Sequence, residues 1–142
     1  MSAKANKATV RRVLSAYGEG NIAPLRDLLD PEVIYHSNSP KELFRFGGRH
    51  QGLAAGIVAL SALASDYTIH HIAVHDLVAE GDVVWVTMDM DRTDRRNKLR
   101  LVVRVAARWE FRNGRIVSVE EYWDTADVAL KQALVKTTPS GK

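Results

Sequence analysis

The sequence predicts an α+β fold in a single domain, and three observations support this. The first part of the chain repeats apolar residues at the three- and four-residue intervals of amphipathic helices. From residue 67 onward, long stretches alternate apolar and polar residues, as strands do. The chain has 142 residues, enough for one domain with a core and too few for two ordinary ones. Helices that precede a meander of strands are typical of the α+β class.

Four segments have the pattern of helices. In the first, Val10, Val13, Leu14 and Tyr17 fall on one helical face, and glycines follow it. In the second, Asn21 stands where a helix cap is expected, with a proline in the first turn. The expected helices cover roughly residues 6–19, 21–29, 53–65 and 125–134.

The strands are expected mainly in the second half. Residues 37–52 read as a loop rich in turn residues, in which Phe44 and Phe46 are available to pack as a lid. Asn113-Gly114 is a strong hairpin signal. The expected strands cover residues 33–36, 67–79, 82–92, 98–112 and 115–123. A loose tail is expected at 137–142, so the single domain, 1–142, has its ordered core at about 6–135.

Composition restricts the class of protein. Apolar residues at 46% and charged residues at 26% are ordinary for a soluble globular protein, and the absence of cysteine leaves no thiol nucleophile. The N-terminus lacks an apolar signal segment, and no apolar run is long enough to span a bilayer, so we expect a cytoplasmic protein without a membrane partner.

A cluster of basic residues lies around one predicted turn, although the formal net charge is only +3. Opposite charges are interleaved with it and aromatics are absent. We therefore interpret the cluster as a solvated hairpin tip, and expect no nucleic-acid partner. Its members are Arg92, Arg95, Arg96, Lys98 and Arg100.

Glu121 breaks an otherwise apolar strand face. Period-two patterning puts it on the same face as Val119 and Trp123, and the hairpin partner strand offers an apolar face that includes Trp109. A carboxylate on an apolar face is costly unless it is paired or used. Glu121 is therefore a functional candidate, and a structural ion pair with an arginine is the alternative.

Four sequence landmarks, spread over nearly the whole chain, resemble the nuclear transport factor 2-like superfamily, and its SnoaL-like and ketosteroid-isomerase-like branches in particular. The resemblance implies a cone-shaped, curved mixed or antiparallel sheet packed against N-terminal helices, a cystatin-like roll with an apolar pocket. It also implies a homodimer formed by the outer face of the sheet. The landmarks are Gly20-Asn21-Ile22, Leu29-Asp30-Pro31-Glu32-Val33, Glu80-Gly81-Asp82-Val83-Val84 and Trp109 to Ile116.

In that fold, hairpin register carries the inward face onto Trp85, Thr87 and Asp89. The sequence alone permits the opposite choice, because the alternate set is the more apolar one: Val84, Val86, Met88 and Met90.

Two relatives within the superfamily suggest different chemistry. The base, the oxyanion-hole tyrosine and the protonated aspartic acid of the steroid isomerase would fall at Ser37, Val13 and near Ala107, so a conventional ketosteroid isomerase is not expected. The resemblance to limonene-1,2-epoxide hydrolase is better, with its two catalytic carboxylates at Asp89 and Glu121.

The same hydrolase implies further pocket residues. Its water-positioning tyrosine corresponds to Tyr35 and its asparagine to Ser37, beside Asn38. Its arginine corresponds to Thr87, a departure that would leave one carboxylate protonated at neutral pH unless Arg45 compensates.

The sequence hypothesis is therefore a cofactor-independent acid/base enzyme for a small, largely apolar organic molecule, of the epoxide hydrolase, polyketide cyclase or isomerase type. Asp89 and Glu121 would transfer protons and Tyr35 would orient a water or substrate oxygen. Substrate contacts are expected from Ser37, Asn38, Trp85, Thr87, Trp109, Val119 and Trp123. The alternatives are that Asp89 faces solvent and that the tryptophans only pack the core.

A non-catalytic small-molecule binder with the same fold is the alternative function. No metal site is expected, because His70 and His71 point to opposite faces of a strand, and His71 and His75 stand roughly 13 Å apart along it.

Overall fold

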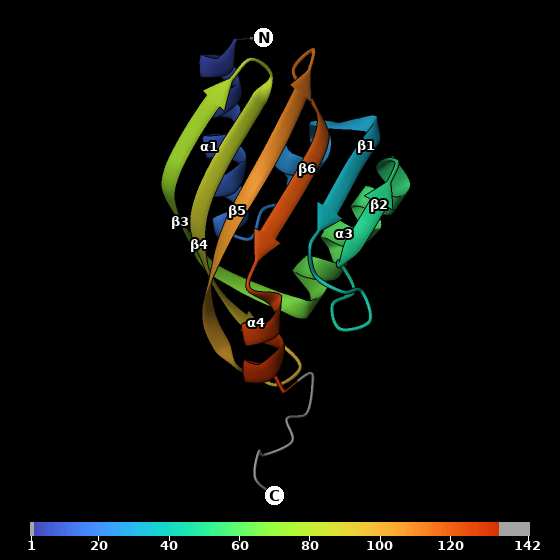
Figure 1. The fold of residues 1–142 in the computed structure, drawn as a ribbon, viewed down its shortest axis with the longest axis vertical. Helices are drawn as coiled ribbons and strands as arrows, with labels where there is room; N and C mark the ends of the chain where they lie inside the picture. Colours follow the sequence, from blue (N-terminus) through green and yellow to red (C-terminus); the bar gives the residue numbers. More distant parts are fainter. Residues whose placement is uncertain (1, 134–142) are drawn as a thin grey trace, which may run out of the picture.

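The computed structural model describes residues 2–133, in which the elements follow the expected order (Figure 1). The helices are α1 (Ala3–Gly18), α2 (Ala23–Asp27), α3 (Leu53–Asp66) and α4 (Thr125–Lys131). The strands are β1 (Leu29–Ser37), β2 (Gly48–Gln51), β3 (Tyr67–Glu80), β4 (Val83–Asp94), β5 (Arg100–Arg112) and β6 (Arg115–Trp123).

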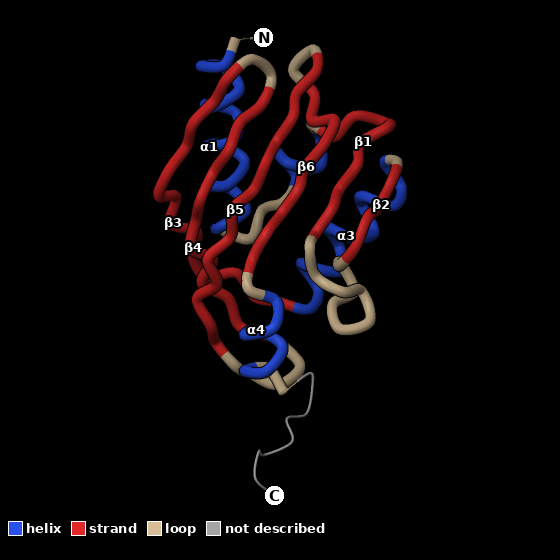
Figure 2. Tube along the Cα trace, in the orientation of Figure 1, coloured by secondary structure: helices blue, strands red, loops and turns tan. Residues whose placement is uncertain are grey.

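The strands form one curved sheet in the order β2-β1-β6-β5-β4-β3 (Figure 2). Strands β3 to β6 form an antiparallel meander, and β1 joins it in parallel to β6. The predicted turn at Asn113-Gly114 is confirmed, since both residues have the positive φ angles, 52° and 76°, of a tight hairpin turn. The sheet therefore brings β1, from the first third of the chain, beside the last strand.

Helices α1 and α3 cover the concave face of the sheet. Helix α1 contacts β3 and β4, and α3 contacts β1, β2 and β3. Helix α4 lies at one end of the sheet, where Asn97 Nδ2 in the β4–β5 turn donates to the Gln132 carbonyl oxygen at 2.8 Å. The covered face carries the core, and the opposite face has no covering element among residues 2–133.

The prediction that Trp85, Thr87 and Asp89 of β4 point inward is wrong. Val84 pairs with Trp109 and Met88 with Val105, and directly opposite residues of an antiparallel pair share a face. The more apolar alternate residues are therefore the buried ones, while Trp85 is 41% exposed. The buried set on β4 is Val84, Val86, Met88, Met90, Arg92 and Asp94.

The elements around the 37–52 loop also differ from expectation. Strand β2 was not expected, because its four polar or small residues carry no alternating pattern, yet it pairs with β1. Strand β1 begins at Leu29 and runs through Pro31, where the pairing with β6 shifts register. Proline is tolerated at such an irregularity because its missing N–H is not needed there.

The end of the expected last helix at residue 134, the core boundary at 135 and the expected tail at 137–142 lie outside the described residues. Within residues 2–133, no helix is long and apolar enough to cross a membrane.

Candidate active site

A cavity of about 60 Å³ lies between the concave face of the sheet and helices α1, α2 and α3. On the same measure, one water molecule needs about 10–15 Å³. Most of the residues in its wall are aliphatic or aromatic, and among the described lining residues the side chains with oxygen or nitrogen atoms are those of Tyr17, Tyr35, Trp109 and Glu121. A mostly apolar cavity with a few convergent polar groups is the usual form of a small-molecule site.

Glu121 and Tyr35 form the polar centre of this cavity. The parallel pairing of β1 and β6 places Ser37 beside Glu121 and Tyr35 beside Val119, so the two cavity-lining side chains lie on adjacent strands. The Tyr35 hydroxyl donates a hydrogen bond to Glu121 Oε1. The prediction that Glu121 turns inward near Tyr35 is confirmed.

Burial raises the pKa of Glu121, and the Tyr35 hydrogen bond and the positive charge of Arg92 oppose this shift only in part. Burial and the adjacent Glu121 charge also raise the pKa of Tyr35, so its hydroxyl stays a donor. A carboxylate with a raised pKa is a stronger base, better matched to proton transfer near neutral pH.

Arg92 is a buried cation close to this centre, and it was misplaced in the sequence interpretation, which assigned it to a solvated hairpin tip. It is only 4% exposed because it occupies an inward position of β4. Its guanidinium carbon lies 4.1 Å from the centroid of the Tyr67 ring and 5.2 Å from that of Trp123. Its Nη1 contacts Met90 Sδ at 3.9 Å, and its buried Nη2 has no hydrogen-bond partner in the part of the chain that the structure describes.

Two further donors in the cavity wall have no partner. Tyr17 Oη and Trp109 Nε1 are buried and make no hydrogen bond within residues 2–133. Burial and the Glu121 charge raise the pKa of Tyr17, which keeps its hydroxyl protonated. Tyr17 was noted in the sequence only as part of a helical apolar face, and its position at the end of that face gave no sign of a polar role.

Ser37, Asn38 and Trp123 support the site from behind and do not line the cavity. Trp123 Nε1 donates to Ser37 Oγ at 3.2 Å, and Asn38 Nδ2 donates to the Trp123 carbonyl oxygen at 3.0 Å. These bonds tie the end of β1 to the end of β6. Of the predicted contact residues, Trp109 and Val119 do line the cavity.

Asp89 does not join Glu121, which corrects the expected carboxylate pair. It lies on the outer face of the sheet with Trp85 and Thr87. Arg104 Nε donates to Asp89 Oδ1 at 2.5 Å, and His75 Nε2 lies 2.9 Å from Asp89 Oδ2. The Arg104 bond, aided by His75, lowers the pKa of Asp89 to about 2. Asp89 is thus a weak base in a surface ion pair.

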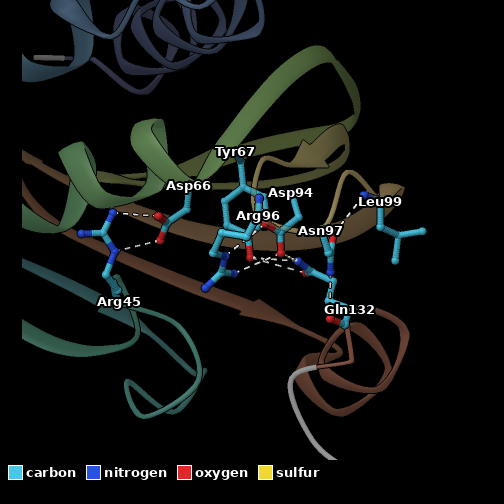
Figure 3. Close-up of polar contacts among 8 residues, drawn as sticks. All are labelled: Arg45, Asp66, Tyr67, Asp94, Arg96, Asn97, Leu99 and Gln132. Atoms are coloured by element: carbon cyan, nitrogen blue, oxygen red, sulfur yellow. Dashed lines mark hydrogen bonds and ion pairs between the residues drawn. The ribbon is translucent and has the colours of Figure 1, made fainter.

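Arg45 does not compensate for the arginine absent at Thr87. Its side chain pairs with Asp66, Nη2 to Oδ1 at 2.7 Å, and is 60% exposed (Figure 3). Beside this pair, Asp94 binds Arg96 at 3.1 Å and accepts a hydrogen bond from Gln132. This polar cluster anchors the 38–47 loop and α4 at one end of the sheet.

The described residues, 2–133, contain no group of three or more histidine and acidic side chains placed to hold a metal ion.

Residues 10–119 match the family model described as the SnoaL-like domain. No curated protein matches the chain in sequence.

Three solved structures illustrate the likeness in fold. A protein from Rhodopseudomonas palustris with a provisional isomerase name is 23% identical, with a TM-score of 0.79, covering 91% of this chain and 96% of its own. TerC, co-crystallised with polyporic acid, is 17% identical, with a TM-score of 0.77, covering 90% and 98%. A protein from Xanthomonas campestris with a cystatin-like fold is 22% identical, with a TM-score of 0.73, covering 91% and 96%.

Proposed function

The chain belongs to the SnoaL-like domain family, and on that premise we propose that it is a cofactor-independent enzyme of the isomerase or cyclase type. Its substrate is a small, largely apolar molecule with an acidic C–H bond next to a carbonyl group. One observation carries the proposal: a carboxylate, Glu121, stands in an apolar cavity with a raised pKa and one oxygen held by Tyr35.

Glu121 is the proposed base. Tyr35 fixes Oε1, and the other carboxylate oxygen then accepts the proton from the substrate carbon. The C–H electron pair moves into the C–C bond to form an enolate, whose oxygen needs hydrogen-bond donors. The Trp109 indole N–H, which has no partner within residues 2–133 and belongs to a residue of the same wall, is suited to this task.

The enolate then has two outcomes. An isomerase returns the proton from Glu121 to a different carbon, whereas a cyclase lets the enolate carbon attack a second carbonyl, whose oxygen takes up a proton. Epoxide hydrolysis by two carboxylates is less well supported, because Asp89 lies on the opposite face of the sheet from Glu121.

Proton abstraction can be measured before the substrate is known. Cyclic ketones and polyketide-like diketones are incubated with the protein in D₂O, and exchange of their acidic C–H protons is followed by NMR. We expect catalysed exchange in the wild type and a loss of about 10²- to 10⁴-fold in Glu121→Gln. Asp89→Asn is the matched control and should exchange at nearly the wild-type rate.

Glutamine still accepts the Tyr35 hydrogen bond, so the variant should fold and still bind ligand, as quenching of Trp109 fluorescence would show. Equal exchange by the wild type and Glu121→Gln would refute the proposal. Ligand binding without exchange would favour the second candidate, a non-catalytic binder, which is supported by the finding that Glu121 is the single carboxylate among the described residues of the cavity wall.

We also propose that the protein is a homodimer joined through the outer face of the sheet. Trp85 (41% exposed) and Tyr122 (39% exposed) stack there with ring centroids 6.4 Å apart, among oppositely charged side chains that suit an isologous contact. Analytical ultracentrifugation should find a wild-type dimer and a Trp85→Lys monomer. A wild-type monomer would contradict this.

A further inference from the structure

Arg92 has donors that the fold does not satisfy. The residue is 4% exposed, and within residues 2–133 its guanidinium forms no ion pair and its buried Nη2 makes no hydrogen bond. Its Nη1 reaches only the Met90 sulfur, at 3.9 Å. A thioether is a weak acceptor, so it replaces little of the water lost on burial.

The stacking of Arg92 does not remove this deficit. The Tyr67 and Trp123 rings interact with the guanidinium, with centroids 4.1 and 5.2 Å from Cζ. Rings over the face of a guanidinium stabilise its charge, but its N–H groups point outward in the guanidinium plane and still need acceptors. A buried charge of this kind is usually compensated by a carboxylate or a ligand.

Arg92 is adjacent to the cavity of the proposed active site. Met90, which it contacts, lines the cavity, and so does Glu121, whose negative charge acts on Arg92. The Tyr17 hydroxyl is a second unpartnered donor in that wall. The cavity therefore has a fixed positive charge beside its wall and a neutral donor in that wall, and no acceptor within residues 2–133 pairs with Arg92 Nη2 or with the Tyr17 hydroxyl.

We propose that Arg92 and Tyr17 form an anion-binding subsite, and that the substrate is an organic acid whose carboxylate or acidic enol oxygen binds there. This inference rests on the proposed function, because it names the substrate class of the same cavity. The anionic oxygen replaces the acceptor that Arg92 lacks. The positive charge of Arg92 also offsets the negative charge of Glu121, which alone would repel an anion from an apolar site.

The subsite also gives substrate binding and proton transfer to different residues of the cavity. Arg92 and Tyr17 hold the acidic end of the molecule, and Glu121 with Tyr35 faces its reacting carbon. Arg92 is then a specificity residue, since a cavity without this charge would favour the neutral analogue of the same shape.

Isothermal titration calorimetry with matched pairs of ligands tests the proposal. The pairs are benzoate with benzamide, phenylacetate with phenylacetamide, and cyclohexanecarboxylate with cyclohexanecarboxamide, at neutral pH and fixed ionic strength. In the wild type we expect an acid to bind at least about tenfold more tightly than its amide. In Arg92→Met this preference should vanish through loss of acid binding, with amide binding unchanged.

Arg100→Met is the matched control. It also removes one positive charge, but Arg100 is on the outer face, 60% exposed and paired with Asp91 at 2.8 Å. The control should keep the acid preference. If it lost the preference as fully as Arg92→Met, general electrostatic attraction would replace the subsite as the explanation.

Tyr17→Phe decides the question if Arg92→Met does not fold, because it removes only an unpartnered hydroxyl. It should weaken acid binding by about three- to tenfold and leave amide binding unchanged. The proposal is overturned if no acid binds more tightly than its amide to the wild type, or if the preference survives both cavity substitutions. These measurements do not involve turnover, so they are independent of the exchange test on Glu121→Gln.

Discussion

Both faces of the sheet carry carboxylates and arginines, but Asp89 is paired with Arg104 on the outer face, whereas Glu121 and Arg92 are not paired with each other on the inner face. On the outer face, Asp89 is bonded to Arg104 and His75, and these contacts lower its pKa to about 2. On the inner face, Glu121 is hydrogen-bonded to the neutral hydroxyl of Tyr35 and has no ion-pair partner among the described residues, and burial raises its pKa. Within residues 2–133, Arg92 likewise has no carboxylate partner, whereas Arg104 is paired with Asp89. Pairing makes the outer charges inert, and its absence makes the inner charges available for chemistry.

The largest expected difference between the faces is in proton transfer. Glu121→Gln should lower the rate of C–H exchange by about 10²- to 10⁴-fold, because it removes the base from the cavity. Asp89→Asn should change the rate by less than about twofold, as for a surface substitution. A comparable loss in both variants would mean that the two carboxylates act together.

The second largest expected difference between the faces is in how much a side-chain truncation destabilises the protein. Met88 is 1% exposed on the inner face, and Met88→Ala should lower the free energy of unfolding by about 2–5 kcal/mol. Its neighbour Thr87 points outward and donates to Asp76 at 2.9 Å, so Thr87→Ala should cost less than about 1 kcal/mol. Urea unfolding measures both changes in the free energy of unfolding. Similar losses in the two variants would contradict the assignment of Met88 to the inner face and of Thr87 to the outer face.

The pH dependence of stability gives a smaller effect. Because the pKa of Glu121 is higher in the folded than in the unfolded protein, the wild type loses stability as pH rises from about 4.3 through that raised value. Glu121→Gln lacks this loss. Its advantage over the wild type should grow over the same range, by about 1.4 kcal/mol for each unit of pKa shift. An advantage that shrinks with rising pH would show a lowered pKa.

The smallest effect is expected at Asp89, and its sign is opposite. Its lowered pKa contributes stability above the ordinary value near 4, and this contribution is lost as pH falls towards 2. Because the ion pair with Arg104 is exposed, Asp89→Asn should lower the melting temperature only slightly, and less at 1 M salt than at low salt. A salt-independent loss would indicate a buried pair.

The fold could be predicted from the sequence, and so could part of the candidate site, Glu121 and Tyr35. Glu121 was identified because it interrupts an apolar face, a signal that depends only on alternation within one strand. Asp89 was misassigned because its orientation depends on how β4 pairs with β5, and burial of the more apolar alternate residues decided that register.

Arg92 and Tyr17 could not be found in this way. Arg92 lies in a charged stretch of sequence, and only the continued alternation of β4 into its end turns it inward. Tyr17 looks like any apolar residue on a helical face until its hydroxyl is seen without a partner. Strand β2 has no alternation of apolar and polar residues, and it forms because its backbone pairs with the free edge of β1.

The parallel pairing of β1 with β6 has a consequence for biosynthesis. Tyr35 and Glu121 are 86 positions apart, so their contact cannot form until residue 121 has left the ribosome. A nascent chain ending before β6 has its first helices and strands but no Glu121, and the apolar surface that β6 would cover stays open. The proposed catalytic pair therefore forms only after β6 has joined the sheet, and we expect chains truncated before β6 to lack this pair and to expose apolar surface.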